Sequence, residues 1–298
     1  MTNSKPGYYG AFFWVATVAF VVPLVVAATA FNSFPVATKP TPAPDVSGVD
    51  HGLWDYLLKT YVDGGLVDYD GLSRDYLFHT YLRQLGACDV DKLSTESDRL
   101  ALLINAYNAF VINGVITHGI DDSVLNYQSD GKEFFDLPEH ILARHTMSLN
   151  NLEHNIIRRV YAEPRVHVVL VCAAKSCPAI RPEAYTGSQL ADQLEDQSRL
   201  FANSTKYVVF DQETRQVSLS PILQWYGDDW KNEGGYLAWL SERVSDPQIR
   251  DALAAVQQGT NSVVWLNYDW ALNSQTTTGV APGGARETAF GSGSVPNQ

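Results

Sequence analysis

The stretch Arg165-Val-His-Val-Val-Leu-Val-Cys-Ala-Ala-Lys-Ser-Cys-Pro178 carries the most information about the fold. Residues 166–171 are almost continuously apolar and β-branched, which is typical of a central strand covered on both faces. Such a strand would end at Cys172, and a short loop of small residues would then lead to Cys177. Loops that follow strand ends often carry the chemistry of α/β folds. The sequence therefore predicts a functional site around Cys172, at the end of a buried strand.

A second segment just upstream, residues 148–158 (SLNNLEHNIIR), adds a carboxylate and an imidazole. We predict a helix over residues 149–162, with Glu153 near the centre of its apolar stripe. A carboxylate that faces a core is costly unless it is paired or hydrogen-bonded, so we predict that Glu153 is buried and bonded. It either caps its helix and ties down a loop, or orients a catalytic histidine or a substrate group. The stripe consists of Leu149, Leu152, Ile156, Ile157 and Val160.

Two histidines lie near this region. His154 is on the flank of the stripe and can act as a base near neutral pH. Because neighbouring helical residues point about 100° apart, a triad that contains both Glu153 and His154 needs a third element between them. His167 would face away from Cys172 by strand alternation, and we expect it to be a satisfied core histidine.

The chain has three cysteines, which are too few for a disulfide scaffold. Cys172 is a buried apolar residue, half of a disulfide with Cys177, a metal ligand, or a nucleophile activated by a nearby base. The spacing of the two cysteines is wider than in most zinc sites. The residues alone leave these interpretations open.

The strongest helix prediction covers residues 97–117, which are apolar nearly all round and therefore expected to be buried. Asn105 and Asn108 lie three residues apart on one face of this helix. Buried amides must find partners, so they either tie neighbouring loops together or line a site as hydrogen-bond donors.

The other predicted elements are helices early in the chain and strands late in it, which favours an α+β fold over a doubly wound α/β sheet. We predict helices over residues 53–61, 75–85 and 188–203, a hairpin formed by residues 207–210 and 217–220, and a late strand over residues 262–267.

The termini differ in composition from the middle of the chain. After a short segment over residues 1–9, residues 10–31 are apolar and uncharged, long enough for a transmembrane helix. This run is a retained anchor or a signal peptide cut near residues 27–30. Its length exceeds the usual signal core of about 7–15 residues, which favours the anchor. A Pro-rich linker over residues 32–47, a globular domain over residues 48–273 and a Gly/Ser/Thr-rich disordered tail over residues 274–298 follow.

The net charge of -12 argues against nucleic acid as a partner, because its binding requires clusters of Lys and Arg. The apolar run over residues 10–31 instead predicts a membrane partner through an N-terminal helix. It also predicts that the domain lies outside the cytoplasm, either tethered to the membrane or secreted after signal cleavage.

Several short motifs resemble the successive blocks of the family catalogued as domain of unknown function 547. They are Asn105-Ala-Tyr-Asn-Ala109, residues 148–154, Cys172-Ala-Ala-Lys-Ser-Cys-Pro178 with Arg181, and Trp225-Tyr226 followed by Asp228. The resemblance implies a relationship to papain- and transglutaminase-like enzymes, and hence a papain-like core with an N-terminal helical part and a later antiparallel sheet. It also implies that Cys172, rather than Cys177, is the functional thiol.

These observations lead to a functional expectation with two alternatives. The first is a cysteine hydrolase or transferase that acts on amide or acyl bonds of a peptide-like or glutathione-like substrate, without a metal or cofactor. The second is a non-enzymatic binding domain with the same fold. The expected catalytic residues are Cys172, His154 and Glu153, and the expected substrate-binding residues are Asn105, Asn108, Cys177 and Arg181.

Overall fold

Helix α4 (Glu96–His118) is the central element of the computed structural model, which describes residues 44–275. Thr95 caps its start by accepting a hydrogen bond from the backbone of Asp98, and Gly119 ends it in a left-handed conformation at φ 60°. Within the described residues, α4 alone is long and apolar enough to cross a membrane, but 83% of its most apolar window is buried. It is therefore the core helix that the sequence predicts.

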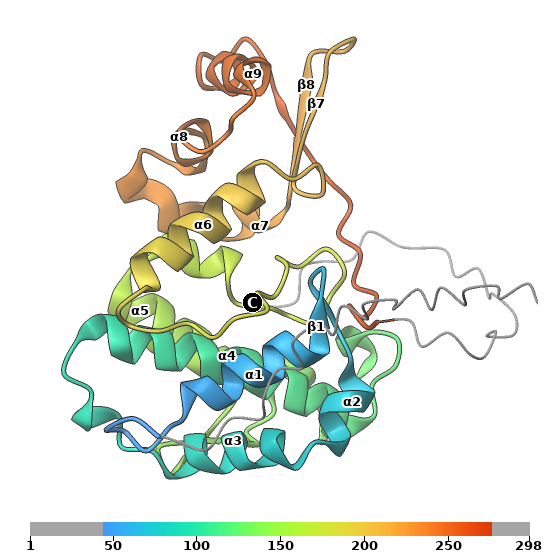
Figure 1. Cartoon of the computed structure of the whole chain (residues 1–298). Helices are drawn as coiled ribbons and strands as arrows, with labels where there is room; N and C mark the ends of the chain where they lie inside the picture. Colours follow the sequence, from blue (N-terminus) through green and yellow to red (C-terminus); the bar gives the residue numbers. More distant parts are fainter. Residues whose placement is uncertain (1–43, 276–298) are drawn as a thin grey trace, which may run out of the picture. The chain divides into compact units, whose positions relative to one another are not determined.

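Three helices of the N-terminal part pack around α4 (Figure 1). Each begins at an aspartate whose carboxylate accepts a backbone N–H of the first turn, the usual means of satisfying these groups. Trp54 stacks on Tyr81 with ring centroids 5.1 Å apart, and both rings are almost fully buried. The helices are α1 (His51–Tyr61), α2 (Tyr69–Arg74) and α3 (Tyr76–Ala87).

Three short antiparallel hairpins accompany these helices, one between α1 and α2 and two after α4, each with two or three residues per strand. They pair β1 (Val62–Asp63) with β2 (Leu66–Val67), β3 (Gln128–Ser129) with β4 (Lys132–Glu133), and β5 (His140–Leu142) with β6 (His145–Met147). Single 3-10 turns at Val90–Lys92, Val124–Asn126 and Phe134–Asp136 complete this part.

The helix expected over residues 149–162 is a π-helix over Asn151–Arg158, followed by the short α5 (Arg159–Tyr161). A π-helix bonds residue i to i+5, so its facing residues lie five positions apart. Leu152 and Ile157 have this spacing and are both fully buried, whereas Val160 is 65% exposed. The apolar stripe is therefore correct for Leu149, Leu152 and Ile157 and wrong for Val160.

The strand predicted over residues 166–171 is absent: Pro164–Val168 forms a 3-10 helix, and residues 169–171 continue as irregular chain. The prediction of burial is confirmed, since Val168 and Val169 are at most 2% exposed. Among residues 44–275, no strand pairs with this segment. Instead, the side chain of Asn108 donates to the carbonyl of Val169 at 3.1 Å and accepts the N–H of Val171 at 3.0 Å. An amide side chain on α4 thus takes the place of a neighbouring strand.

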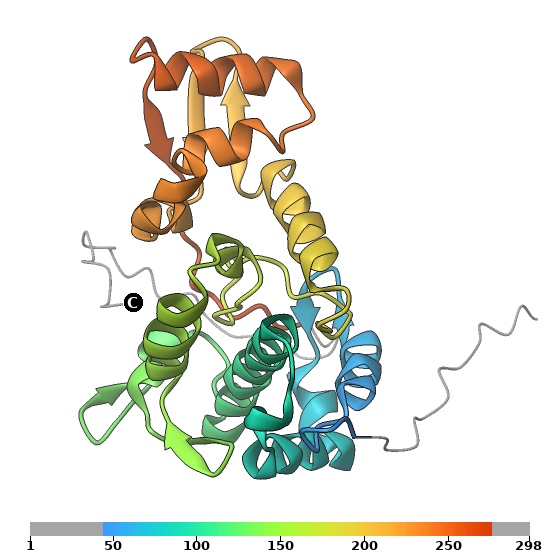
Figure 2. The ribbon, with the colours of Figure 1, turned by 90° about the vertical axis from the view of Figure 1, so that its left-hand side faces the viewer.

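The later part of the chain forms a three-stranded sheet in the order β7-β8-β9, covered by two helices (Figure 2). The predicted hairpin is confirmed, with Val208 opposite Leu219 in an antiparallel pair. The late strand is also present, but it pairs parallel to β8, so the expected purely antiparallel sheet is wrong at this edge. The elements are β7 (Val208–Asp211), β8 (Gln216–Leu219), α7 (Ile222–Trp225), a 3-10 helix over Gly227–Glu233, α8 (Tyr236–Ser241), α9 (Pro247–Gln257) and β9 (Val263–Trp265).

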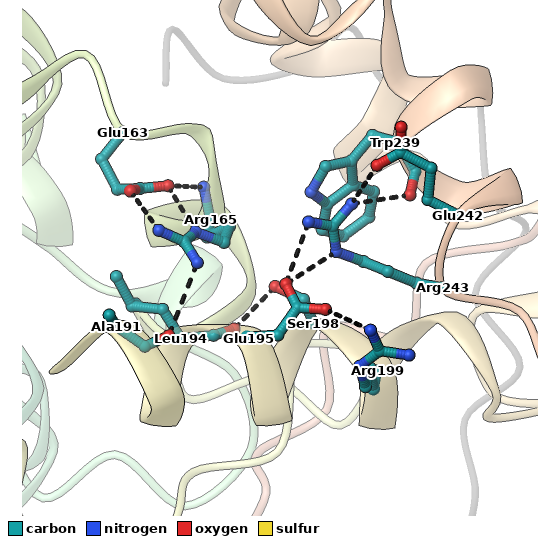
Figure 3. Close-up of polar contacts among 10 residues, drawn as sticks. All are labelled: Glu163, Arg165, Ala191, Leu194, Glu195, Ser198, Arg199, Trp239, Glu242 and Arg243. Atoms are coloured by element: carbon teal, nitrogen blue, oxygen red, sulfur yellow. Dashed lines mark hydrogen bonds and ion pairs between the residues drawn. The ribbon is translucent and has the colours of Figure 1, made fainter. Parts of the chain in front are cut away.

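Helix α6 (Leu190–Ala202) is linked through charged side chains both to the chain just beyond α8 and to the 3-10 helix before the cysteine loop (Figure 3). Glu195 on α6 accepts two hydrogen bonds from the guanidinium of Arg243, at 3.1 and 2.9 Å, just beyond α8. Arg165, itself paired with Glu163, donates to the carbonyl of Ala191 at 3.5 Å. These contacts hold α6 against the turn that leads to the cysteine loop.

The fold class is α+β, as the sequence predicts. The predicted segments over residues 1–9, 10–31 and most of 32–47, and the tail from residue 276 onward, lie outside the described residues. The described chain begins in the linker at residue 44 and contains the whole predicted globular domain, residues 48–273.

Candidate functional site

The loop that carries Cys172 is held in place by the segment that ends the described chain. Ala173 has a left-handed backbone at φ 63°, a conformation that costs energy for a residue with a side chain. The carbonyl of Ala173 accepts the N–H of Asn273 at 2.9 Å, and the N–H of Lys175 bonds to the carbonyl of Ala271 at 2.8 Å. The surrounding chain thus stabilises a strained backbone directly beside a thiol.

The thiol of Cys172 is half-buried and surrounded by hydrogen-bond donors. Its Sγ atom lies 3.2 Å from the hydroxyl of Tyr268. Burial opposes ionisation, but hydrogen bonds from Cys177, Tyr268 and the backbone of Ala174 outweigh it and lower the pKa of Cys172. The side chain therefore has the environment of a stabilised thiolate.

Cys177 is buried beside Cys172 and behaves in the opposite way. Its Sγ atom accepts the backbone N–H of Cys172 at 2.9 Å and lies 3.8 Å from the carbonyl of Leu170. Burial and the adjacent thiol of Cys172 raise the pKa of Cys177 well above its ordinary value. Of this pair, Cys172 is the ionisable and more accessible thiol.

Both cysteines line a pocket whose volume for the centres of water-sized molecules is ≈ 30 Å³, enough for about two waters. Side chains converge on it from α4, the π-helix, the 3-10 helix over Pro164–Val168, α7 and the segment after β9. Besides the cysteines, the lining residues are Tyr107, Phe135, Asn150, Glu153, His167, Leu170, Pro178, Ile222, Trp225, Tyr226 and Tyr268.

Glu153 is buried, 7% exposed, and hydrogen-bonded, as the sequence predicts. Its Oε1 atom accepts the hydroxyl of Tyr226 at 3.0 Å, and Tyr107 on α4 also bonds to this carboxylate. Burial and the Glu153 carboxylate raise the pKa of both tyrosines, so their hydroxyls stay protonated. Glu153 therefore fixes two phenol groups in the wall of the pocket.

His167 lines the same pocket and is held by two contacts. Its Nε2 atom lies 2.7 Å from Oδ2 of Asp229, and its ring stacks on Tyr226 with centroids 3.8 Å apart. Burial lowers the pKa of His167 despite the nearby carboxylate, so the ring is neutral near pH 7. The prediction of a buried and satisfied histidine is confirmed. The prediction that it faces away from the cysteine was wrong, because it rested on the alternation of a strand that does not form.

Asp229 is shared between His167 and Arg158 of the π-helix. Arg158 donates to both carboxylate oxygens at 2.8 and 3.0 Å, and also donates to Nδ1 of His154 at 2.8 Å. Although burial opposes ionisation, the hydrogen bonds from His167 and Arg158 lower the pKa of Asp229. A continuous polar chain thus runs from His154 through Arg158 and Asp229 to His167.

His154 does not line the pocket and bonds to Arg158 instead of a cysteine. As expected for neighbouring helical residues, Glu153 and His154 point to different partners. Burial lowers the pKa of His154, and its Nε2 atom has no hydrogen-bond partner among residues 44–275. The geometry thus connects His154 to the pocket only through the polar chain.

Of the four residues expected to bind substrate, three also lie outside the lining of this pocket. Asn105 pairs with the backbone of Tyr185 through both ends of its amide, at 2.7 and 2.9 Å. Asn108 binds the chain before Cys172, as described above. Arg181 forms ion pairs with Glu183 and Asp196. The interpretation of the two amides as ties between segments is confirmed.

Sequence reasoning missed Asp229 and Tyr268 as parts of the site. The motif suggested Asp228, but its side chain is 87% exposed and pairs with Lys231. Tyr268 lies near the end of the described chain, 96 residues after Cys172, with no local signal of proximity. Only the aromatic and acidic composition of residues 225–229 and 268–270 could have suggested a role.

The comparison with protein families finds a match over residues 90–202 to the family described as "Protein of unknown function, DUF547". This part of the chain is similar to that family. The DUF547 match contains α4, the π-helix and the cysteine loop, whereas Tyr226, Asp229 and Tyr268 lie beyond it. Comparisons with curated proteins and with solved structures found no match. Among residues 44–275, no group of three His, Cys, Asp or Glu side chains is arranged to hold a metal ion.

Proposed function

We propose that the DUF547 domain is a thiol-dependent hydrolase or transferase that acts on amide or acyl bonds, with Cys172 as its nucleophile. The observation that carries this proposal is the half-buried thiol with a lowered pKa in a pocket that also contains a neutral, carboxylate-bound histidine. Thiolates in such surroundings are nucleophiles, and a nearby imidazole is the usual partner for the proton.

In this proposal His167, and not His154, exchanges protons with the thiol and the leaving group. His167 lines the pocket and its Nε2 atom is bonded to Asp229, so the proposal assigns the proton exchange to the other ring nitrogen, Nδ1. The stacking on Tyr226 and the bond to Asp229 limit rotation of the ring, and Arg158 keeps the carboxylate charged. This arrangement follows the nucleophile–base–acid logic of cysteine enzymes, with the acid orienting the base.

Tyr268 is the proposed donor to the negative charge that develops on the carbonyl oxygen of the substrate. Its hydroxyl lies 3.2 Å from Sγ of Cys172, and burial together with the thiols raises its pKa, so it remains protonated. A donor that stabilises the thiolate is close enough to serve the oxyanion after attack. Asn105, which we expected to bind substrate as a hydrogen-bond donor, is occupied by Tyr185.

The surroundings of the pocket support a peptide-like or glutathione-like substrate. The cavity admits only a small group at the thiol, so the reacting carbonyl would enter while the rest of the substrate stays outside. Tyr268 packs against Trp225 and Trp270, with centroids 4.9 and 4.7 Å away, and all three rings are half-buried. Such rings bind the apolar parts of a flexible ligand.

The test is acylation by p-nitrophenyl acetate, an activated ester whose acetyl group is small enough to reach the thiol. We expect a burst of nitrophenol with one acetyl group on Cys172, found by peptide mapping. Cys172→Ala should abolish the burst, and His167→Gln should slow it by about 10²–10⁴-fold. Cys88→Ala is the matched control, since this thiol is buried elsewhere, and should react as the wild type does. An undiminished burst in Cys172→Ala would overturn the proposal.

A non-enzymatic binding domain is the second candidate, and one observation favours it. Within residues 44–275, no hydrogen bond joins Cys172 to an imidazole; the thiol contacts Tyr268 and Cys177 instead. If this candidate is correct, Cys172→Ala leaves ligand-induced thermal shifts intact, and no acyl group is found on the wild-type protein.

We also propose that residues 10–31 anchor the domain to the membrane, outside the cytoplasm, on the grounds of length and composition given above. Protease treatment of spheroplasts is the test. Digestion of the domain in intact spheroplasts supports the proposal, and protection until lysis contradicts it.

A further inference from the structure

The two cysteines of the pocket form a pair whose members differ in accessibility. Cys172 is half-buried, whereas Cys177 is 3% exposed and lies behind it. The two thiol groups are within hydrogen-bonding reach of each other, and the N–H of Cys172 bonds to Sγ of Cys177 at 2.9 Å. One thiol can thus meet a small molecule from solution, and the other can reach only its neighbour.

We propose that Cys172 and Cys177 are a reversible redox pair that closes an intramolecular disulfide after a hydroperoxide oxidises Cys172. This proposal does not depend on the hydrolase or transferase activity, because it rests on the placement of the two sulfur atoms.

The reaction proceeds in two balanced steps. The Cys172 thiolate attacks a peroxide oxygen; an S–O bond forms, the O–O bond breaks, and the departing oxygen leaves as water after it takes up a proton. Cys177 then attacks the sulfur of the sulfenic acid; the S–S bond forms, the S–O bond breaks, and a second water carries away the thiol proton. Two thiols lose two electrons in total, and hydrogen peroxide is reduced to two waters.

The surroundings suit each cysteine to its step. The donors around Cys172 favour the thiolate that attacks the peroxide. Cys177 is shielded from solvent, and the N–H of Cys172 points at its sulfur, where it can stabilise the negative charge that develops during the second step. The pocket volume of ≈ 30 Å³ admits a molecule as small as hydrogen peroxide.

The backbone already brings the two residues together. The N–H of Cys177 bonds to the carbonyl of Ala174 at 3.1 Å, which closes a turn within the loop between the cysteines. A disulfide requires Cβ atoms about 3.5–4.5 Å apart, and the 2.9 Å bond from the Cys172 N–H to Sγ of Cys177 already places that sulfur beside the backbone of Cys172. Because the closed loop is short, the bond gains little from chain entropy and stays reducible.

The disulfide would also regulate the proposed catalysis, because it removes the nucleophile and protects it from irreversible oxidation. This consequence, unlike the disulfide itself, rests on the proposed function.

The experiment counts thiols in the reduced, full-length protein before and after hydrogen peroxide, with N-ethylmaleimide added under denaturing conditions. The reduced chain should take up three labels, one for each cysteine. After peroxide we expect one label, on Cys88, and a mass lower by two hydrogen atoms. Because Lys175 lies between the cysteines, trypsin should release a linked pair of peptides, one ending at Lys175 and the other starting at Ser176. Dithiothreitol should restore three labels.

Two variants make the result specific. Cys88→Ala should form the same bridge, whereas Cys177→Ala should leave Cys172 to gain two oxygen atoms as a sulfinic acid. Three labels on the oxidised wild type, a sulfinic acid on its Cys172, or a bridge that includes Cys88 would each overturn the proposal. The wild-type result stands even if Cys177→Ala does not fold. Since no substrate is involved, a missing bridge with an intact ester burst refutes only this inference.

Discussion

Replacement of His140 by phenylalanine should remove a large part of the acid sensitivity of the fold. His140 begins strand β5, is 2% exposed, and stacks on Phe110 of α4 with ring centroids 5.0 Å apart. Neither ring nitrogen has a hydrogen-bond partner among the described residues. The nearest carboxylate oxygen, on Glu139, is 3.9 Å away and also binds His118. The imidazole therefore sits in an apolar site that disfavours its charged form.

The structure determines the sign and the size of the effect. Burial, together with the nearby His118, lowers the pKa of His140 from 6.5 to about 4. Between these values the unfolded chain binds a proton and the native state does not, so the free energy of unfolding falls as pH falls from about 6.5 to about 4. A pKa difference of this size lowers the free energy of unfolding by about 1.4 kcal/mol at pH 5.5 and by about 2.5 kcal/mol at pH 4.5, relative to its value at pH 7.5.

Urea unfolding between pH 4.5 and 7.5 measures this loss. In His140→Phe, the decrease in unfolding free energy over this range should be smaller than in the wild type by about 2.5 kcal/mol. His79→Gln, which removes an exposed histidine, is the matched control and should keep the wild-type dependence. The pH slope is the readout, so a change in absolute stability from the larger ring does not affect the test. Equal slopes for His140→Phe and the wild type would refute the reasoning.

Three further variants or measurements test the pocket and its supports. Glu153→Ala should lower the free energy of unfolding by about 2–4 kcal/mol, because two buried tyrosine hydroxyls lose their acceptor; a change within about 0.5 kcal/mol in chemical denaturation would contradict this. Asn108→Ala should cost about 2–4 kcal/mol in the same assay by leaving one N–H and one carbonyl before the cysteine loop without partners, and a near-neutral result would mean that water replaces the amide. Near pH 7, Cys172 should alkylate faster than Cys88, whose pKa is raised by burial; peptide mapping of iodoacetamide-treated protein measures both rates, and a faster Cys88 would disprove the order.

Features that depend on neighbouring residues along the chain could be predicted from the sequence. The capping threonine, the left-handed glycine and the continuous apolar surface determine helix α4 locally, and its bounds were predicted within one residue at each end. The hairpin of β7 and β8 follows from two β-prone runs around a polar turn. The burial of Glu153 followed from its place in an apolar stripe, even though the helix is a π-helix.

Other features depend on contacts between distant parts of the chain. The valine-rich run before Cys172 is not a strand, because Asn108 satisfies its backbone and no second strand of the described chain lies beside it. Apolar runs of this length do not reveal whether a strand or another element will cover them. Because the strand does not form, His167 lines the pocket together with Cys172 instead of facing away from it.

The composition of the site is likewise a property of the tertiary structure. The sequence determined that a cysteine loop with a low-pKa thiol candidate would follow a buried segment, since that follows from local composition. It did not determine that Asp229, 62 residues after His167, and Tyr268, 96 residues after Cys172, would complete the pocket. A hydrogen bond requires only that two side chains meet in space, and no periodicity along the chain records such a meeting.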